Sequence, residues 1–395
     1  MAAAAGLLDA DGTVRATIFA EMSALAARTG ALNLGQGFPD VDGPAPVARA
    51  AADAILAGVN QYPPGPGIAP LRQAVAAHQR VHYGLDLDPD SQVLVTTGAT
   101  EALAAAVLAL TSPGDEVLTL EPYYDSYAAV VAMAGATHTT APLRPTPDGF
   151  RLDVGALERA VTPRTRMILL NSPHNPTGAV LTRDELTAVA RVAVAHDLLV
   201  VTDEVYEHLV LGVEHVPVAT LPGMAQRTLT ISSSGKTFSF TGWKIGWVTG
   251  PAELVTAVRT VKQFLTYVSG APFQPAVAHA LTDPASLAWV DALVASLTDR
   301  RDLLCAGLTE AGFDVVRPDG TYFVLADAGP LGAVDGAAFC RELPARAGVV
   351  AVPVSAFTQP GSVTHDRLAS WVRFTFVKRH DVLEDALTRL RGAFA

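Results

Sequence analysis

Short apolar runs alternate with amphipathic segments from residue 70 to about residue 250. Most of these runs contain no charged residue inside them, which is typical of strands that are buried on both faces. The segments between the runs carry the spacing of helices. The pattern predicts strands at residues 92–97, 116–120, 167–170, 198–201 and 227–231, and helices at residues 71–83, 102–110 and 183–196. It therefore predicts an α/β fold with a mainly parallel sheet flanked by helices.

The two ends of the chain show a different pattern. Helices are expected at residues 17–27 and 45–57, on either side of a turn rich in glycine and proline. Beyond residue 251 the pattern predicts helices at residues 252–266, 274–281, 286–311 and 383–390, and strands at residues 313–316, 322–325, 348–352 and 372–376. A chain of 395 residues exceeds the usual size of one hydrophobic core. We therefore predict a large domain (41–275), a smaller α+β domain (276–395), and an N-terminal arm (1–40) that packs with the small domain.

Polar side chains collect where the predicted strands of the large domain end. In open parallel sheets, ligands bind beyond the carboxyl ends of the strands. Five strand ends that converge on one rim are a stronger signal than any single motif. The residues concerned are Thr97, Gly98, Ala99, Tyr124, Asn175, Asp203, Ser233 and Lys236.

Lys236 follows an apolar run and three serines, which is an unusual position for a purely solubilising charge. Burial and neighbouring cations can lower the pKa of such an amine and make it a nucleophile toward an aldehyde. Lys244, eight residues later, could then hold an anionic group of the same ligand. Gly98, Ala99 and Thr100, at a strand-to-helix junction, could form an anion site, although many ordinary βα turns look the same.

The other polar residues at the rim allow two interpretations each. Asp203 ends an apolar strand, and a buried carboxylate needs a partner such as a protonated heterocyclic nitrogen. Alternatively, it caps the following helix. Asn175 could simply shape a turn, and Tyr124 could simply belong to the core.

Composition and charge exclude several classes of protein. Half of the residues are hydrophobic and 17% are charged, which suits a globular enzyme. The net charge of −11 disfavours nucleic acid and anionic membranes as partners. No apolar run reaches the roughly 18 residues of a membrane span, and the N-terminus lacks the pattern of a secretory signal. The ten histidines show no close ligand spacing with carboxylates, so no metal is predicted, and two cysteines, Cys305 and Cys340, suit a reducing cytoplasm.

Two nucleotide-binding patterns fail in detail. Gly235-Lys236-Thr237 resembles the end of a phosphate-binding loop, but Thr230 occupies the position where that loop requires glycine. Gly35 and Gly37 have dinucleotide-turn spacing, but Asp40 occupies the third glycine position. A nucleotide-hydrolysing enzyme is therefore disfavoured.

Four ordered motifs carry a family resemblance over essentially the whole chain: 175–178 (NPTG), 203–206 (DEVY), 233–236 (SSGK) and 373–374 (RF). They resemble the class I/II aminotransferases, which are pyridoxal-phosphate enzymes of the aspartate aminotransferase fold, or fold type I. Residues 34–40, 235–238, 242–244 and 372–374 further resemble the kynurenine, glutamine and methionine aminotransferase subgroup. Residues 60–67 and 172–175 resemble actinobacterial N-succinyldiaminopimelate aminotransferases.

The resemblance implies roles for residues around the cofactor. Lys236 would form the Schiff base and move a proton between the substrate Cα and the cofactor. Asp203 would pair with the pyridinium nitrogen, and Tyr206 and Asn175 would bond the phenolic oxygen. Tyr124 would stack on the ring.

The resemblance also implies roles at the phosphate and the substrate. The phosphate would contact Gly98, Ala99, Thr100, Ser233 and Lys244, where most relatives have arginine. Tyr62 would reach the phosphate of the neighbouring subunit, which implies a homodimer. Arg373 would bind the substrate α-carboxylate with two parallel hydrogen bonds, with Asn175 nearby and Gly37 leaving room.

These roles predict a cytoplasmic aminotransferase with ping-pong kinetics. An L-amino acid would donate to a 2-oxo acid, with 2-oxoglutarate favoured. The donor is N-succinyl-LL-diaminopimelate, or a methionine, glutamine or aromatic amino acid. Extra carboxylates would require cations such as Arg15, Arg28 or Lys262, and an apolar donor would require a wall such as Phe19, Phe38 or Phe357. The alternatives are a β-lyase acting on cysteine S-conjugates, or a catalytically silent regulator, which the intact residue set disfavours.

Overall fold

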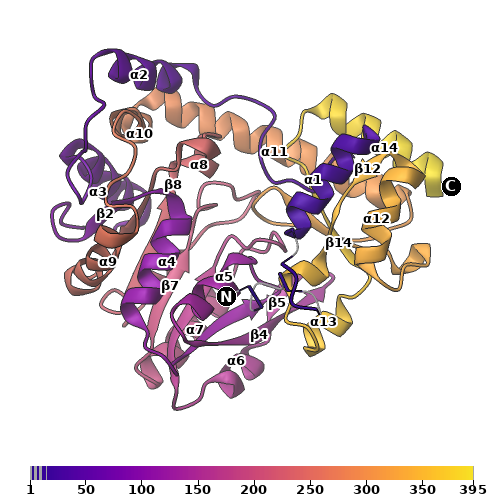
Figure 1. Ribbon diagram of the computed structural model, residues 1–395, viewed down its shortest axis with the longest axis horizontal. Helices are drawn as coiled ribbons and strands as arrows, with labels where there is room; N and C mark the ends of the chain where they lie inside the picture. The colour runs from indigo at the N-terminus through magenta and orange to yellow at the C-terminus, as the bar shows by residue number, and fades with distance from the viewer. Residues whose placement is uncertain (1, 4–6, 9–10, 15, 395) are drawn as a thin grey trace.

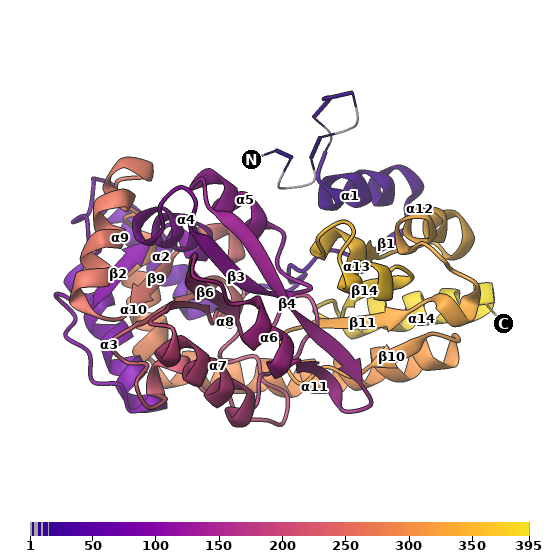
Figure 2. The ribbon, with the colours of Figure 1, turned by 90° about the horizontal axis from the view of Figure 1, so that it is seen from below.

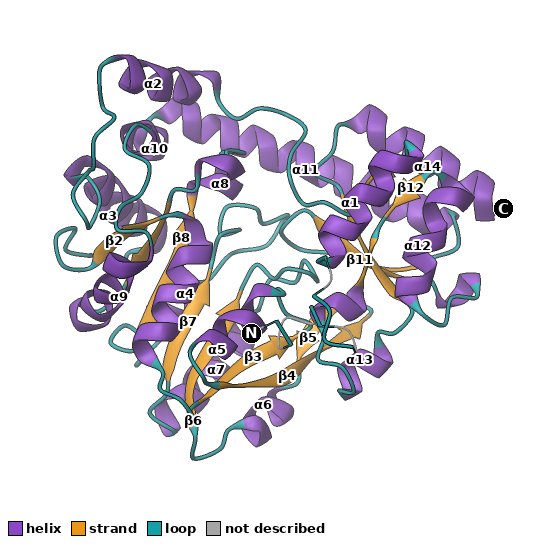
Figure 3. Ribbon diagram, in the orientation of Figure 1, coloured by secondary structure: helices purple, strands orange, loops and turns teal. Residues whose placement is uncertain are grey.

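The computed structural model describes residues 2–3, 7–8, 11–14 and 16–394 of the chain. Its largest element is an eight-stranded sheet with helices on both faces (Figure 1, Figure 3). In spatial order the strands are β2 (Val93–Thr96), β9 (Gly246–Thr249), β8 (Thr228–Ser233), β7 (Leu199–Asp203), β6 (Thr165–Asn171), β3 (Glu116–Glu121), β4 (Thr137–Thr146) and β5 (Gly149–Leu152). The four neighbour pairs from β8 to β4 are parallel, which confirms the predicted mainly parallel sheet.

Alternate residues of the central strands point to opposite cores. Leu118, Ile168 and Val200 belong to one buried cluster, whereas Val117 and Met167 belong to another on the other face. Both faces are therefore buried, which explains why these strands appear in the sequence as unbroken apolar runs. The helices of this part are α2 (Ala45–Leu56), α3 (Ala69–Tyr83), α4 (Gly98–Leu110), α5 (Ser126–Met133), α6 (Val154–Ala160), α7 (Arg183–Ala195), α8 (Ser234–Thr237), α9 (Ala252–Leu265) and α10 (Phe273–Thr282).

Local sequence signals fix the ends of several helices. Helix α7 begins with a capping box, in which Thr182 and Glu185 satisfy each other's backbone N–H groups. The long helix α11 (Pro284–Glu310) begins with Asp283 as N-cap and proline at its first position. It runs from the large-sheet part to the C-terminal part (Figure 2) and corresponds to the helix predicted at residues 286–311.

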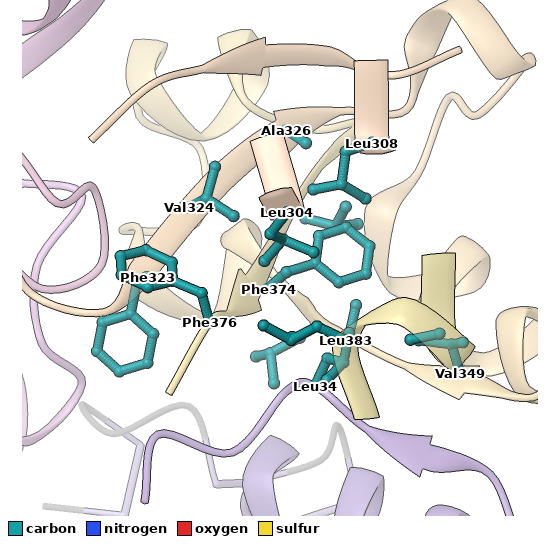
Figure 4. Close-up of a cluster of buried hydrophobic side chains, with 14 of the residues drawn as sticks. Leu34, Leu304, Leu308, Phe323, Val324, Ala326, Val349, Phe374, Phe376 and Leu383 are labelled. Carbon is teal, nitrogen blue, oxygen red and sulfur yellow. The ribbon is translucent and has the colours of Figure 1, made fainter. Parts of the chain in front are cut away.

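The C-terminal part is built on a second sheet of four strands. In spatial order they are β10 (Asp314–Val316), β11 (Phe323–Asp327), β14 (Trp371–Thr375) and β13 (Val352–Pro353), all antiparallel. Helices α12 (Gly336–Ala347), α13 (Val363–Arg367) and α14 (His380–Phe394) accompany it. Figure 4 shows its core, where side chains of α11, β11, β14 and α14 meet Leu34 from the N-terminal segment.

The N-terminal segment joins this C-terminal part. Helix α1 (Ile18–Thr29) lies beside α12 (Figure 1), and β1 (Leu32–Asn33) pairs in parallel with β12 (Val349–Val350). These contacts support the predicted arm at residues 1–40, which we retain as a proposal together with the boundaries 41–275 and 276–395. In the described part of the chain, no helix is long and apolar enough to cross a membrane.

Several strands differ from the sequence prediction. The hairpin β4–β5 was not predicted, because β4 is rich in threonine and proline and only partly buried. Strand β9 was also missed, and it runs antiparallel to both of its neighbours. The apolar run at residues 348–352 is not one strand, because β12 and β13 belong to different sheets.

Candidate active site

A cavity of about 320 Å³ lies at the carboxyl ends of the parallel strands. It is bounded on the other side by the N-terminal segment and by β11 and β14 of the second sheet. The structure brings together all the predicted site residues except Tyr62. The predicted residues that line the cavity are Gly37, Gly98, Ala99, Thr100, Tyr124, Asn175, Asp203, Tyr206, Ser233, Lys236, Lys244 and Arg373.

Lys236 lies in the single helical turn α8, directly after β8. It lies just beyond the carboxyl end of the strand, as predicted from the sequence. Its Nζ donates to the hydroxyl of Tyr322 at 3.1 Å, and that hydroxyl donates to the carbonyl of Gly37 at 2.6 Å. The amine also lies 5.6 Å from the ring centre of Tyr206. The Tyr322 hydroxyl therefore holds a half-buried amine at the cavity, and among the described residues no carboxylate forms an ion pair with it.

Asp203 ends β7 and is only 5% exposed. Its carboxylate accepts hydrogen bonds from the Tyr127 hydroxyl at 2.8 Å and from the Val205 amide at 3.4 Å. Neither partner carries a positive charge, and burial raises the pKa of Asp203 to about 6. The bond to Val205 is weak and long, so capping the next turn does not account for this carboxylate. It has the environment of a group that awaits a cationic ligand.

The start of α4 forms an anion site, by which we mean Gly98, Ala99, Thr100, Ser233 and Lys244. Gly98 has a φ of +72°, a conformation that glycine adopts without strain and that turns the chain from β2 into the helix. No side chain of the N-cap residue caps the first turn. The Lys244 amine lies 3.4 Å from the Thr100 hydroxyl, and burial, followed by the charge of Lys236, lowers the pKa of Lys244. Free amides, hydroxyls and an ammonium group together favour a bound anion.

Arg373 projects from β14 and is 2% exposed. Its guanidinium donates to Asn175 Oδ1 at 2.9 Å and to the Gly35 carbonyl at 3.0 Å, and its Nε has no partner among the described residues. The ring of Phe323 lies 4.0 Å from the guanidinium carbon. Burial lowers the pKa of Arg373 to about 10, so the group still carries its charge at neutral pH. A buried cation whose protein partners are neutral fits the binding of a ligand carboxylate.

Glycine at position 37 is required by close packing. A Cβ atom there would lie 2.3 Å from the ring of Phe323. The contact with Arg373 is made by Gly35 rather than by Gly37, so Gly37 makes room for the aromatic residues and not directly for the guanidinium.

The tyrosines of the site occupy distinct positions. Burial raises the pKa of Tyr206 well above its ordinary value, with the nearby Tyr322 as the next cause, so its phenol remains a hydrogen-bond donor. Tyr124 lies edge-on to Tyr127 at the cavity wall, with 5.6 Å between ring centres. Tyr62 lies outside the cavity of its own chain, is 80% exposed, and packs edge-on against Tyr267.

Three residues of the site were missed from sequence. Tyr322 was predicted only as part of a strand, yet its hydroxyl holds Lys236. Asp125 lines the cavity next to Tyr124, and burial raises the pKa of its carboxyl. Phe323 stacks on Arg373. A polar residue beside a predicted site residue was the available signal for Asp125, whereas nothing local marked Tyr322.

The residues considered for recognition of the substrate side chain fall into two groups, those at the cavity and those away from it. Phe19 and Phe38 line the cavity, and the Phe357 ring centre lies 4.7 Å from the Arg373 guanidinium. Among the candidate cations, Arg28 is exposed away from the cavity and Lys262 is buried, donating to the Tyr267 carbonyl at 2.9 Å. Arg15 lies outside the described residues. Neither Arg28 nor Lys262 therefore lines the cavity.

The cavity fits the pyridoxal phosphate that the resemblance implies. It offers an amine for the aldehyde, a buried carboxylate for a protonated ring nitrogen, and an anion site for the phosphate. These three groups come from α8, β7 and α4, which are far apart in sequence but adjacent at the rim.

Comparison with known proteins gives the same assignment. Residues 29–390 match the family model described as aminotransferase class I and II. The chain is 61% identical, over 95% of both chains, to a probable N-succinyldiaminopimelate aminotransferase DapC of Mycobacterium tuberculosis, and 38% identical, again over 95% of both, to the methionine aminotransferase of Escherichia coli. A solved structure of N-succinyldiaminopimelate aminotransferase from Mycobacterium tuberculosis superimposes with a TM-score of 0.92 at 60% identity, covering 96% of this chain and 97% of that one. The chain therefore belongs to the class I and II aminotransferases, a family of pyridoxal-phosphate-dependent transaminases with the fold-type I architecture.

Proposed function

We propose that this aminotransferase uses N-succinyl-LL-diaminopimelate as amino donor and 2-oxoglutarate as acceptor, by a ping-pong mechanism. The observation that carries the amino-acid specificity is Arg373, a buried guanidinium in the same cavity as Lys236, whose Nε has no hydrogen-bond partner in the described part of the chain. Among the described residues no carboxylate forms an ion pair with Arg373, although Asp125 of the same cavity acts on it, so its charge is available to the α-carboxylate of the substrate. The similarity to the mycobacterial enzyme supports the choice of donor.

The side chains of the cavity have complementary roles in this proposal. When bound, pyridoxal phosphate supplies an electron-poor ring that stabilises negative charge at the substrate Cα. Lys236 Nζ takes the proton from Cα, and the Tyr322 hydroxyl aims that amine. Asp203 holds a proton on the ring nitrogen, and the phenol of Tyr206 and the amide of Asn175 bond the ring oxygen. Arg373 fixes the Cα–H bond relative to Lys236, because it anchors the neighbouring carboxylate.

The charged side chains of the cavity indicate where the side chain of the substrate lies. Lys236, Lys244 and Arg373 are the cations that line it among the described residues, and each has a role already. The additional carboxylates of the succinylated donor therefore extend past Phe19 and Phe38 toward the opening. There, solvent or the neighbouring subunit compensates their charge.

The proposed active unit is a homodimer in which Tyr62 reaches the phosphate of the other subunit. Tyr62 and Phe264 are 80% and 86% exposed, and Tyr267 is 45% exposed beside them. Exposed aromatic residues of this kind are typical of a buried interface. The free, buried thiols of Cys305 and Cys340 suit the reducing cytoplasm, where we place the enzyme.

If Tyr62 reaches the phosphate of the other subunit, Tyr62→Phe should bind the cofactor more weakly. Loss of one hydrogen bond to a charged phosphate costs about 1.5–3 kcal/mol, so cofactor affinity should fall about 10- to 150-fold while sedimentation still gives a dimer. Phe264, which is not proposed to contact the cofactor, provides the matched control in Phe264→Leu. Unchanged cofactor affinity in Tyr62→Phe would remove this residue from the site.

A half-reaction screen tests the proposed function. The cofactor-loaded enzyme is mixed with single donors, and the rate of the visible absorbance change is measured without acceptor. We expect the highest kcat/KM for N-succinyl-LL-diaminopimelate, and recovery of the starting spectrum on addition of 2-oxoglutarate. A higher value for methionine, glutamine or kynurenine would reject the donor. Release of pyruvate and ammonia from a cysteine S-conjugate, at a higher rate than transamination, would instead indicate the lyase.

A further inference from the structure

We propose that a second site, separate from the active-site cavity, binds a divalent transition-metal ion such as Zn²⁺ through the imidazoles of His78, His82 and His208. Each histidine offers one ring nitrogen, and the three nitrogens lie within 4.8 Å of one another. None of the three residues lines the active-site cavity. The sequence prediction of no metal site considered only histidines spaced closely with carboxylates, and it did not combine His78 and His82 with His208, which is 130 residues from His78.

The three rings surround one point. His78 and His82 lie four residues apart on α3, so they project from the same face of the helix. His208 lies in the turn that follows β7, two residues after Tyr206. The distances between ring centres are 4.5 Å, 4.9 Å and 5.1 Å for the pairs 78–82, 78–208 and 82–208. This nearly equilateral arrangement is that of three ligands around a common ion.

The nitrogen atoms need little movement to bind a metal. Nε2 of His78 and Nε2 of His208 are 2.7 Å apart, a separation at which one proton or one metal ion must lie between the two lone pairs. Zn–N bonds of about 2.0–2.1 Å with tetrahedral angles place ligand nitrogens about 3.3 Å apart. The ring tips would therefore separate by a few tenths of an ångström. Imidazole ligands favour Zn²⁺, Cu²⁺ or Ni²⁺ over Mg²⁺ or Ca²⁺.

A buried carboxylate beside the histidines supports a cation. Glu207 is 3% exposed and, together with His82 and His208, lines a second pocket. Its Oε1 accepts from the Ser232 hydroxyl, whereas its Oε2 makes no hydrogen bond of good geometry among the described residues. The neutral Tyr83 hydroxyl lies beside this carboxylate and supplies no charge. An unpartnered oxygen of a buried carboxylate is costly unless positive charge lies nearby. A divalent ion on the three imidazoles would supply that charge.

A metal ion can reach the three histidines from solvent, and its binding would affect the elements that support the cofactor pocket. His78 is buried, whereas His82 is exposed, so an ion can enter from solvent on the side of His82. A bound ion would tie α3 to the turn after β7. That turn also carries Tyr206, and β7 ends in Asp203, so the ion would stiffen the support of the cofactor pocket without entering it.

Zinc binding to the cofactor-loaded enzyme tests the proposal. The protein is dialysed against a chelator and titrated with zinc chloride, and bound zinc is counted by mass spectrometry. We expect one Zn²⁺ per chain, with affinity reduced more than about 100-fold in His82→Ala, because even outer-shell changes at metal sites cost 10- to 100-fold. His380→Ala, which removes an exposed histidine at the start of α14, is the matched control and should bind zinc as the wild type does.

Two further measurements keep the result unambiguous. Pyridoxal phosphate can itself bind zinc, so the count is taken as the difference between wild type and His82→Ala at equal cofactor content. His208→Gln provides a second variant, and Co²⁺ provides a spectroscopic probe whose visible absorption reports nitrogen ligation. Equal zinc binding in wild type and both variants would overturn the site. Absence of a stoichiometric ion in the wild type would mean that an N–H···N hydrogen bond joins His78 and His208 instead.

Discussion

Replacing Asp203 with asparagine tests whether this carboxylate is held for a cationic ligand that the chain does not supply. The side chain is 5% exposed, and its two partners, Tyr127 and Val205, are neutral donors. Its pKa rises from 3.8 to about 6, chiefly because of burial. In the cofactor-free protein the ionised carboxylate should therefore oppose folding.

The size and sign of the effect follow from the pKa. The pKa of Asp203 is higher in the folded protein than in the unfolded chain, so the native state binds the proton more tightly. Proton binding therefore stabilises the folded protein fully below pH 3.8, and this stabilisation is lost as the pH rises to about 6. A displacement of about two pH units corresponds to about 3 kcal/mol. Asparagine still accepts from Tyr127, but its N–H group faces the Val205 N–H, which costs about 1 kcal/mol. The cofactor-free variant should thus be about 2 kcal/mol more stable than wild type at pH 8.

Urea unfolding of the two cofactor-free proteins measures this difference. The advantage of Asp203→Asn should shrink to about zero near pH 4.5, where the native Asp203 is protonated. With cofactor bound the order should reverse, because the ring nitrogen loses its carboxylate partner. The exposed Asp299→Asn on α11 is the control and should show neither effect. A stability difference that is equal at both pH values, or equal with and without cofactor, would refute the reasoning.

Two more substitutions probe the ends of the ligand. Arg373→Lys keeps the charge but loses the paired geometry, so one charge-assisted hydrogen bond of about 1.5–3 kcal/mol should disappear and kcat/KM should fall about 10- to 150-fold. The fall should be similar for every amino-acid donor in steady-state assays, and a fall confined to one donor would contradict the role of Arg373. Lys244→Gln removes the ammonium group of the anion site. Residue 244 has a positive φ of 56°, and glutamine carries a Cβ atom at this position just as lysine does. Cofactor titration should show an affinity about 10- to 100-fold lower, whereas an unchanged affinity would exclude Lys244 as a phosphate ligand.

The parts of the fold that follow from local burial were predictable. The strands β3, β6, β7 and β8 are almost entirely buried because both of their faces are covered, so their apolar runs are visible in the sequence and their polar ends mark the edge of the sheet where the cavity lies. Strand β4 gives no such signal, since its threonines are half-exposed. The division of residues 348–352 between two sheets depends on pairing with β1 and β14, which the sequence of the run itself does not encode.

The same distinction applies to the site. Lys236 and Asp203 were predictable because a charged residue in an apolar setting is costly without a purpose, whereas Arg373 was identified only through the resemblance of residues 373–374 to the class I/II aminotransferases. The role of the Tyr322 hydroxyl was not predictable. It depends on the contact between Tyr322 and Gly37, which are separated by most of the length of the chain. The histidine cluster was missed for the same reason, since α3 and the turn after β7 meet only in the folded protein.

Covalent trapping of the cofactor identifies the lysine that reacts with its aldehyde. The chain has lysines only at positions 236, 244, 262 and 378, so reduction of the holoenzyme with borohydride followed by peptide mapping can assign the link to a single residue. We predict that the label lies on Lys236 alone, and that Lys236→Ala binds cofactor without covalent label or measurable transamination. A label on Lys244, Lys262 or Lys378, or substantial transamination by Lys236→Ala, would contradict the account.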